Sequence, residues 1–255
     1  MRWNTKIIDF INDELGGDAS CFVESPFFRG ERTLRKANLE FDLTDQEAAL
    51  RESLLKDESQ FLMKFGFGPT FEPVEPSAIS MTAQRMAMLN ALIDSPITVV
   101  LKERQVGLTN ALNAIGLMSV CQGRSVCAVS PKTAFATDKS YNVKLKYSVM
   151  PFFMKPGIHA WNQKSMDFDN GGSYECFGAD RNRLIGRRIG LLLMDDAEHM
   201  DPDFLVENAS VTASHGARVI VSGLVTRSGF FREALPNANY VLFGREGVSR
   251  LEGNA

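Results

Sequence analysis

The chain of 255 residues is 44% hydrophobic and 23% charged, which suffices for one full α/β core with a small helical appendage but not for a second large domain. Its 28 Lys and Arg against 31 Asp and Glu give a net charge of −3, which argues against a protein that coats nucleic acid by bulk electrostatics. Four cysteines without C-x-x-C or zinc-type spacing, and the lack of a signal peptide or membrane-length apolar run, predict a cytoplasmic protein with reduced thiols and no membrane partner.

The segment up to about residue 42 is poorly patterned, and the first predicted helix begins after Thr44. Glu47 follows three residues later, as in a capping box, and apolar residues recur at helical spacing up to Gly66. A linker with three prolines comes next, at Pro69, Pro73 and Pro76. We therefore predict that residues 1–80 form a small N-terminal helical segment with a linker, and that residues 81–255 form the main domain.

From Thr82 onward, predicted helices alternate with predicted strands. The expected elements are a helix from 82, a strand at 97–100, a helix at 109–121, a strand at 125–129, a helix at 132–149, a hairpin at 165–177, a strand at 189–194, a helix after 202, and strands at 218–222 and 240–243. Strands separated by helices imply right-handed crossovers, and hence an α/β fold with a mainly parallel, doubly wound sheet. Ligands of such sheets bind at the carboxyl ends of the strands.

The stretch VVLKERQVGLTNAL at 99–112 has the layout of a phosphate loop. An apolar strand leads into a turn at Gly107, and Thr109 opens a helix. Backbone N–H groups of such a turn and the positive end of the helix create an anion site, and the Thr109 hydroxyl is placed to ligate Mg²⁺. The same sequence is also typical of an ordinary strand, turn and helix that bind no phosphate.

The pattern G-x-x-x-x-G-K-[ST] is met incompletely in this loop. Lys102 stands at the first glycine position, and Leu108 stands at the position of the usual lysine. Because Leu108 cannot neutralise a phosphate, Lys102 or Arg104 would have to supply the missing positive charge. The sequence leaves the choice between these two open.

The stretch IGLLLMDDAEHMDP at 189–202 reads as a strand buried on both faces that ends in two carboxylates. Asp195 and Asp196 follow its last apolar residue, where a metal ion and an attacking water would lie. An Asp-Asp pair at a strand end is also typical of a helix cap or a solvated turn. Ser222 and Gly223 likewise end a strand, so all three stretches are expected at the same sheet edge, as one nucleotide site would require.

The chain resembles the ATPase motor domain of the tailed-phage terminase large subunit, in particular its T-even-like branch. The resemblance covers residues 40–235 and is strongest from Thr82 to Phe231. Four stretches carry it in the family's order: TAQRMAML, ERQVGLT, MKPGIHAWNQKSMDFDNGGSYECFGAD before the acidic strand, and RVIVSGLVTRSGFF after it. The resemblance implies a phosphate-loop NTPase fold that uses ATP and Mg²⁺.

The resemblance also implies roles for individual residues. Thr109 and Asp195 would hold Mg²⁺, and Asp196 stands where the family has a glutamate that orients the attacking water, with Glu198 as a substitute if it does not lie in a solvated turn. Gln84 matches the adenine-reading glutamine, and Arg187 is the candidate for an arginine donated to a neighbouring subunit's nucleotide. The expected ATP-binding set is Gln84, Lys102, Arg104, Gln105, Val106, Gly107, Leu108, Thr109 and Asn110, and the expected coupling set is Ser222, Gly223 and Leu224.

The implied activity is translocation of double-stranded DNA into a procapsid in the host cytoplasm. The implied partners are the DNA, the portal protein and the small terminase subunit, and the chain would form a ring when docked and be a monomer in isolation. Only about two dozen residues follow Phe231, so no nuclease domain is expected. Two alternatives stay open, namely a degenerate nucleotide-binding member with a regulatory or assembly role, and a helicase-like ATPase.

Two clusters of basic residues are candidates for contact with nucleic-acid phosphates. They are Arg181, Arg183, Arg187 and Arg188 in one segment, and Lys139, Lys144 and Lys146 in another. Without interleaved aromatic residues, such clusters are more often solvated faces. The sequence leaves both interpretations open.

Overall fold

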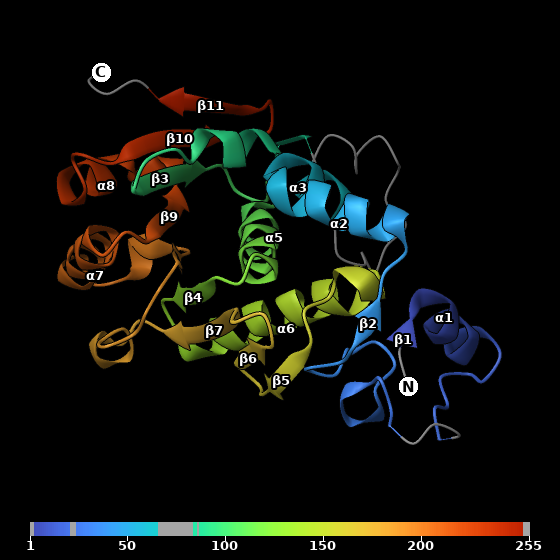
Figure 1. Cartoon of the computed structure of the whole chain (residues 1–255). Coiled ribbons are helices and arrows are strands. Elements are labelled where there is room, and N and C mark those ends of the chain that lie inside the picture. The colour runs from blue at the N-terminus through green and yellow to red at the C-terminus, as the bar shows by residue number, and fades with distance from the viewer. Residues whose placement is uncertain (1–2, 21–23, 66–83, 86, 252–255) are drawn as a thin grey trace.

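The computed structural model describes residues 3–20, 24–65, 84–85 and 87–251, and these form an α/β fold around one large sheet (Figure 1). The sheet order is β11-β10-β3-β9-β8-β4-β7-β6-β5. The six neighbouring strands from β10 to β7 run parallel, and β11, β6 and β5 extend the two edges antiparallel. The strands are β3 (Ile97–Lys102), β4 (Ser125–Ser130), β5 (Ile158–Trp161), β6 (Ser165–Phe168), β7 (Ser173–Gly178), β8 (Leu191–Met194), β9 (Arg218–Leu224), β10 (Asn239–Phe243) and β11 (Val248–Leu251).

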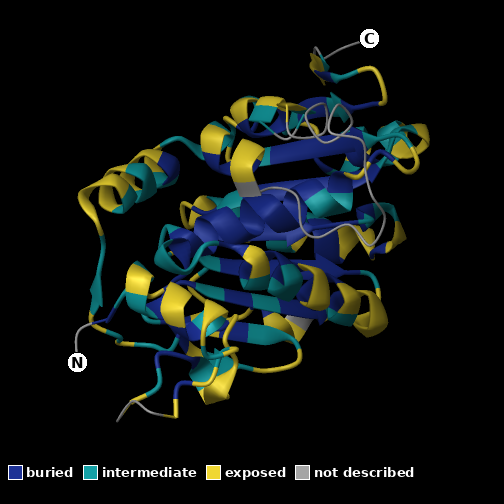
Figure 2. Cartoon of the chain, turned by 90° about the vertical axis from the view of Figure 1, so that its right-hand side faces the viewer, coloured by how far each residue is buried: buried dark blue, intermediate teal, exposed yellow. Residues whose placement is uncertain are grey.

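Helices cover both faces of this sheet, which confirms the doubly wound arrangement. One face carries α5 (Leu108–Cys121) and α6 (Thr133–Val149), and the other carries α7 (Pro202–Ser214) and α8 (Ser228–Ala234) (Figure 1). The central strands are buried, as Figure 2 shows, because each lies between two layers of helices. No helix among the described residues has both the length and the apolar character to cross a membrane.

Two helices before the sheet, α2 (Asp45–Lys56) and α3 (Glu58–Phe65), replace the single helix expected up to Gly66. The capping box at the start of α2 is confirmed, since the Thr44 hydroxyl accepts from the Glu47 N–H and the Glu47 carboxylate accepts from the Thr44 N–H. The expectation of one helix was wrong because Asp57 leaves the helical conformation, with φ −101° and ψ 93°. Its carboxylate then accepts from the Gln60 N–H at 3.0 Å, which caps the start of α3.

The first 42 residues contain more structure than their pattern suggested. A parallel pair, β1 (Trp3–Asn4) and β2 (Phe41–Asp42), encloses α1 (Thr5–Asp13), and their small core is separate from the core of the sheet. By contrast, α2 and α3 contribute to the large core that also contains α5 and α6. The predicted proline linker and the boundary at residue 80 lie outside the described residues.

The remaining sequence expectations hold, but the sequence did not predict three of the elements between residue 158 and residue 251. The helix before β3 is present at residues 84–85 and 87–92, and the hairpin expected around Asp169-Asn-Gly-Gly is formed by β6 and β7. The edge strands β5 and β11 and the short helix α8 were not expected. The described cysteines, Cys121, Cys127 and Cys176, are free thiols buried in the core.

Candidate functional site

The loop between β3 and α5 has the backbone of an anion-binding turn. Gln105 and Gly107 both take left-handed conformations, with φ 60° and φ 80°, and Gly107 caps the N-terminus of α5. A Cβ on Gly107 would meet no atom within 4 Å, so conformation rather than space favours glycine there. The loop and the first residues of α5 line a cavity of about 590 Å³, which Leu224 and Arg245 close from the neighbouring strand ends. The free N–H groups of a helix N-terminus facing a cavity favour an anion.

Three strand ends meet at the carboxylate of Asp195, directly after β8. Lys102, at the end of β3, donates to Asp195 Oδ1 at 3.2 Å and to Asp196 Oδ1 at 2.6 Å. The Thr109 hydroxyl donates to Asp195 Oδ2 at 2.9 Å. From the end of β9, the Ser222 hydroxyl donates to Asp195 Oδ1. The residues expected to share one site therefore do lie together.

The charges of this cluster stabilise one another. Asp195 is only 3% exposed, and burial alone would raise its pKa, but Lys139, Lys102 and the hydrogen bond from Ser222 hold the pKa well below its usual range. Burial would lower the pKa of Lys102, yet the two aspartates raise it above its ordinary value. Asp195 is thus an ionised carboxylate in a buried setting, which is the form that a metal ion or a lysine binds.

Lys139 is a member of the site that the sequence did not reveal. It projects from α6, its side chain is 8% exposed, and its Nζ lies 2.9 Å from Asp195 Oδ2. The interpretation of the lysine cluster as a solvated face was therefore wrong for Lys139. It was also wrong for Lys146, which is buried, with a pKa that burial lowers to about 8. Lys144 is half-buried, with its ammonium 5.1 Å from the centre of the Trp161 ring.

The other expected loop residues divide into two groups. Arg104 and Gln105 are exposed and line the cavity, so Arg104 is free to reach a ligand there. Val106 and Leu108 point into the core with α5, which explains why a lysine is absent from the latter position. Asn110 is half-buried in the first turn of α5. The end of β3 and the loop therefore bring the cations Lys102 and Arg104 to the cavity, whereas the first turn of α5 brings none.

Glu198 is buried rather than solvated. Its side chain is 3% exposed, and within the described part of the chain its Oε2 has no hydrogen-bond partner. It lies in a short 3₁₀ turn after Asp196, which itself has a left-handed backbone with φ 56°. The Glu198 Oε2 occupies space next to Gly223, where an added Cβ would lie 2.7 Å from it and 2.2 Å from Phe231 Cζ. The expectation of a solvated turn at Glu198 was wrong, because the end of β9 and α8 enclose it.

Gln84 is not among the residues that line the cavity. Its side chain is exposed on the helical segment before β3. The next residue, Arg85, donates to the backbone carbonyl of Arg245, and Arg245 lines the cavity. Gln84 is therefore carried on an element fastened to the cavity rim, and its role as an adenine reader stays a prediction.

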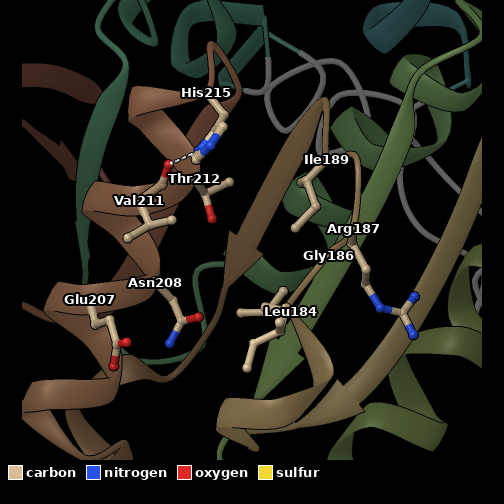
Figure 3. A pocket seen from close by; sticks show the side chains of 10 residues that line it. Leu184, Gly186, Arg187, Ile189, Glu207, Asn208, Val211, Thr212 and His215 are labelled. Atoms are coloured by element: carbon tan, nitrogen blue, oxygen red, sulfur yellow. Dashed lines mark hydrogen bonds between the residues drawn. The ribbon is translucent and has the colours of Figure 1, made fainter.

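Arg187 is engaged elsewhere in the molecule. Its guanidinium donates with both terminal nitrogens to the Glu175 carboxylate, and it lies over the Phe177 ring at 5.8 Å. The segment that carries it borders a second cavity, of about 330 Å³, against α7 (Figure 3). Figure 3 shows the guanidinium pointing away from this cavity. Its donation to a neighbouring subunit stays a prediction, since such a residue need not contact its own subunit's site.

The oxygens at Asp195 fit a Mg²⁺ ion. Two ligands at adjacent corners of an octahedron with bonds of about 2.0–2.1 Å lie roughly 2.9 Å apart. Thr109 Oγ1 and Asp195 Oδ2 are 2.9 Å apart. Among the described residues, no three His, Cys, Asp or Glu side chains gather into a metal cluster. A Mg²⁺ ion here would therefore need water and substrate phosphate oxygens to complete its coordination, as is usual for this ion.

No protein-family model matches the sequence. The resemblance to the terminase motor domain accordingly rests on the four stretches quoted above.

Proposed function

We propose that this chain is a Mg²⁺-dependent ATPase with a phosphate-loop fold, and that hydrolysis drives translocation of double-stranded DNA, as in the terminase large subunits that it resembles. The ATPase part of this proposal depends on one observation, namely that Lys102, Thr109 and Ser222 all contact Asp195. Lys102 and Ser222 come from the ends of two strands and Thr109 from the first turn of α5, beside a cavity that an anion-binding turn lines. Such convergence at one sheet edge is expected of a nucleotide site and not of unrelated surface turns.

The residues divide the work of hydrolysis as follows. The backbone N–H groups of the loop and of the α5 N-terminus bind the β- and γ-phosphates. Lys102 exchanges its aspartate partners for phosphate oxygens, and Thr109 and Asp195 hold Mg²⁺. The bound Mg²⁺ supplies positive charge to the phosphoryl group being transferred. Once Lys102 has left it, Asp196 accepts a hydrogen bond from the attacking water and orients it.

Ser222 would pass the state of the site to the rest of the sheet. Its hydroxyl contacts Asp195, and the next residue, Gly223, packs against Phe231 of α8. Loss of the γ-phosphate would change the contacts of Asp195 and so release the end of β9 that carries Ser222. Under the hypothesis that the chain is a DNA motor, this movement shifts a surface that grips DNA. The ring, the portal and small-subunit contacts, and the function of Arg187 belong to the same proposal.

A second candidate function is nucleotide binding without rapid turnover, in a regulatory or assembly role. Two observations favour it, namely the burial of Leu108 where a lysine would contact phosphate, and the engagement of Asp196 by Lys102. Asp196 is also one methylene shorter than glutamate. Under this second hypothesis the site binds Mg-ATP, but the Asp196 carboxylate stays hydrogen-bonded to Lys102 and does not orient water.

Binding of a fluorescent ATP analogue with Mg²⁺, together with phosphate release, tests these proposals. We expect Lys102→Ala to weaken binding by at least ~10-fold, because charged hydrogen bonds contribute about 1.5–3 kcal/mol each. Lys56→Ala is the matched control, since Lys56 is exposed and pairs only with Glu52 on α2 among the described residues. Absence of Mg-ATP binding by the unaltered chain would refute both candidates, and binding without turnover would select the second.

The motor half needs a separate assay with DNA. We expect double-stranded DNA to stimulate phosphate release and the protein to displace a third strand from a DNA triplex, which reports translocation on a duplex. Unwinding of a forked duplex without triplex displacement would instead select the helicase-like alternative. ATP turnover that DNA does not change would refute the DNA-driven motor while leaving the ATPase proposal standing.

A further inference from the structure

Lys139 contacts Asp195 from α6, none of whose residues is among those that line the cavity. Its Nζ lies 2.9 Å from Oδ2, while Lys102 and Ser222 occupy Oδ1. Lys139 sits in the middle of α6, whose inner face is packed against the sheet. The hydroxyl of the next residue, Ser140, donates to the Gln163 carbonyl at 2.9 Å and fastens this turn of the helix. Lys139 is therefore a cation in a fixed position.

Lys102 differs from Lys139 in what it can reach. Lys102 ends β3 and lines the 590 Å³ cavity, whereas Lys139 is not among the residues that line it. An anion in the cavity would thus attract Lys102 away from the aspartates but would leave Lys139 in place. The two lysines have different parts in the same cluster, one exchangeable and one permanent.

The four charged groups of the cluster cancel formally. Two lysines, Lys102 and Lys139, face two aspartates, Asp195 and Asp196, within 2.6–3.2 Å. A Mg²⁺ ion entering alone would place two further positive charges beside this neutral cluster. When a Mg²⁺ ion enters together with a nucleotide, the phosphates of the nucleotide offset the positive charge of the ion. The same phosphates also draw Lys102 away from the aspartates. The arrangement of charges therefore favours the entry of Mg²⁺ with a nucleotide over the entry of Mg²⁺ alone.

We propose that Lys139 is a specificity-determining residue that restricts the metal site at Thr109 and Asp195 to nucleotide-bound Mg²⁺ by neutralising Asp195 permanently. This inference rests on the proposed function, in that it assigns Thr109 and Asp195 to the metal. The ion would lie at most about 5 Å from Lys139 Nζ, given the 2.9 Å to Oδ2 and a metal–oxygen bond of about 2.1 Å. Even with the screening of bulk water, a unit charge at that distance changes the affinity for a divalent cation roughly tenfold.

Binding of Mn²⁺ without nucleotide, followed by electron paramagnetic resonance, tests the inference on the intact chain. We expect the unaltered protein to bind Mn²⁺ weakly and Lys139→Met to bind it at least ~10-fold more tightly. Lys139→Arg keeps the charge and should behave as the unaltered protein does. Lys144→Met, on the same helix but directed at Trp161, is the matched control and should change nothing. Unchanged or weaker Mn²⁺ binding by Lys139→Met would overturn the inference.

Two further variants secure the interpretation. Lys139→Gln removes the charge but keeps a donor, so it should reproduce the gain if Lys139→Met fails to fold. Adding Asp195→Asn to Lys139→Met should abolish the gain, and persistence of the gain would overturn the inference by placing the metal elsewhere. Because these measurements contain no nucleotide, their failure is distinct from a failure of the proposed ATPase, which Mg-ATP binding by the unaltered chain decides.

Discussion

Replacing Asp195 by Asn should destabilise the fold strongly, apart from any effect on activity. The substitution keeps the size of the side chain but removes the charge that Lys102 and Lys139 share. Lys102 retains Asp196 at 2.6 Å, so the loss falls chiefly on Lys139, which in the described part of the chain forms its ion pair with Asp195 alone. Its side chain is 8% exposed. Leaving such a buried charge without its partner costs about 3–5 kcal/mol, a large fraction of the roughly 5–15 kcal/mol that stabilises a domain.

Equilibrium unfolding in urea of four proteins measures this effect. They are the unaltered chain, Asp195→Asn, Lys139→Met and the double variant. Because an ion pair replaced on both sides leaves no buried charge, the double variant should recover at least about half of the stability lost by Asp195→Asn. The reasoning is refuted if Asp195→Asn lies within about 1 kcal/mol of the unaltered chain, or if the two single effects simply add.

Two further predictions concern packing and pH. Gly223→Ala should lower the free energy of unfolding by about 1–3 kcal/mol, because the added Cβ would lie 2.2 Å from the buried Phe231 ring. Gly229→Ala is the control and should not lower this free energy, because the space around Gly229 is open. Equal urea midpoints for the two variants would contradict this prediction. Burial lowers the pKa of Lys155 to about 7 from 10.5, so between these pH values the unfolded chain binds a proton that the folded chain lacks, and stability rises with pH. The stability difference between the unaltered chain and Lys155→Met should therefore grow in favour of the unaltered chain from pH 7 to pH 10, and a constant difference would exclude the buried amine as its source.

The features that the sequence predicted well are those set by neighbouring residues. The capping box at Thr44 and Glu47, the glycine turn before α5 and the β6–β7 hairpin each depend on a few consecutive side chains and on backbone conformation. The order of parallel strands then placed the strand ends at one edge, which brought Asp195 close to Thr109. Local chemistry and one topological rule were enough for this part of the site.

Two of the charged residues that the sequence misjudged depend on partners far along the chain. Lys139 and Glu198 look like solvated charges when read with their neighbours, but α6 brings one against β8, and the end of β9 encloses the other. The short edge strands β5 and β11 have too few residues for an alternating pattern. Asp57 ends α2 within a run of helical spacing, because its side chain offers the next helix a cap. Tertiary burial decided the cases of Lys139 and Glu198, whereas the cap at Asp57 is local and exposed.

The position of β9 between β3 and β8 explains how the site forms without a lysine in the loop helix. Adjacent strands lie about 4.8 Å apart, so Lys102 must reach over the end of β9 to contact Asp195. Small residues at that end, Ser222 and Gly223, leave the path open, and Ser222 adds a hydroxyl to the same carboxylate. Under the proposed function, Lys102 would exchange these aspartate contacts for phosphate oxygens. If Lys102 stayed 2.6 Å from Asp196 Oδ1 in a nucleotide complex, that oxygen would not be free to orient the attacking water. The site would then bind nucleotide without turnover.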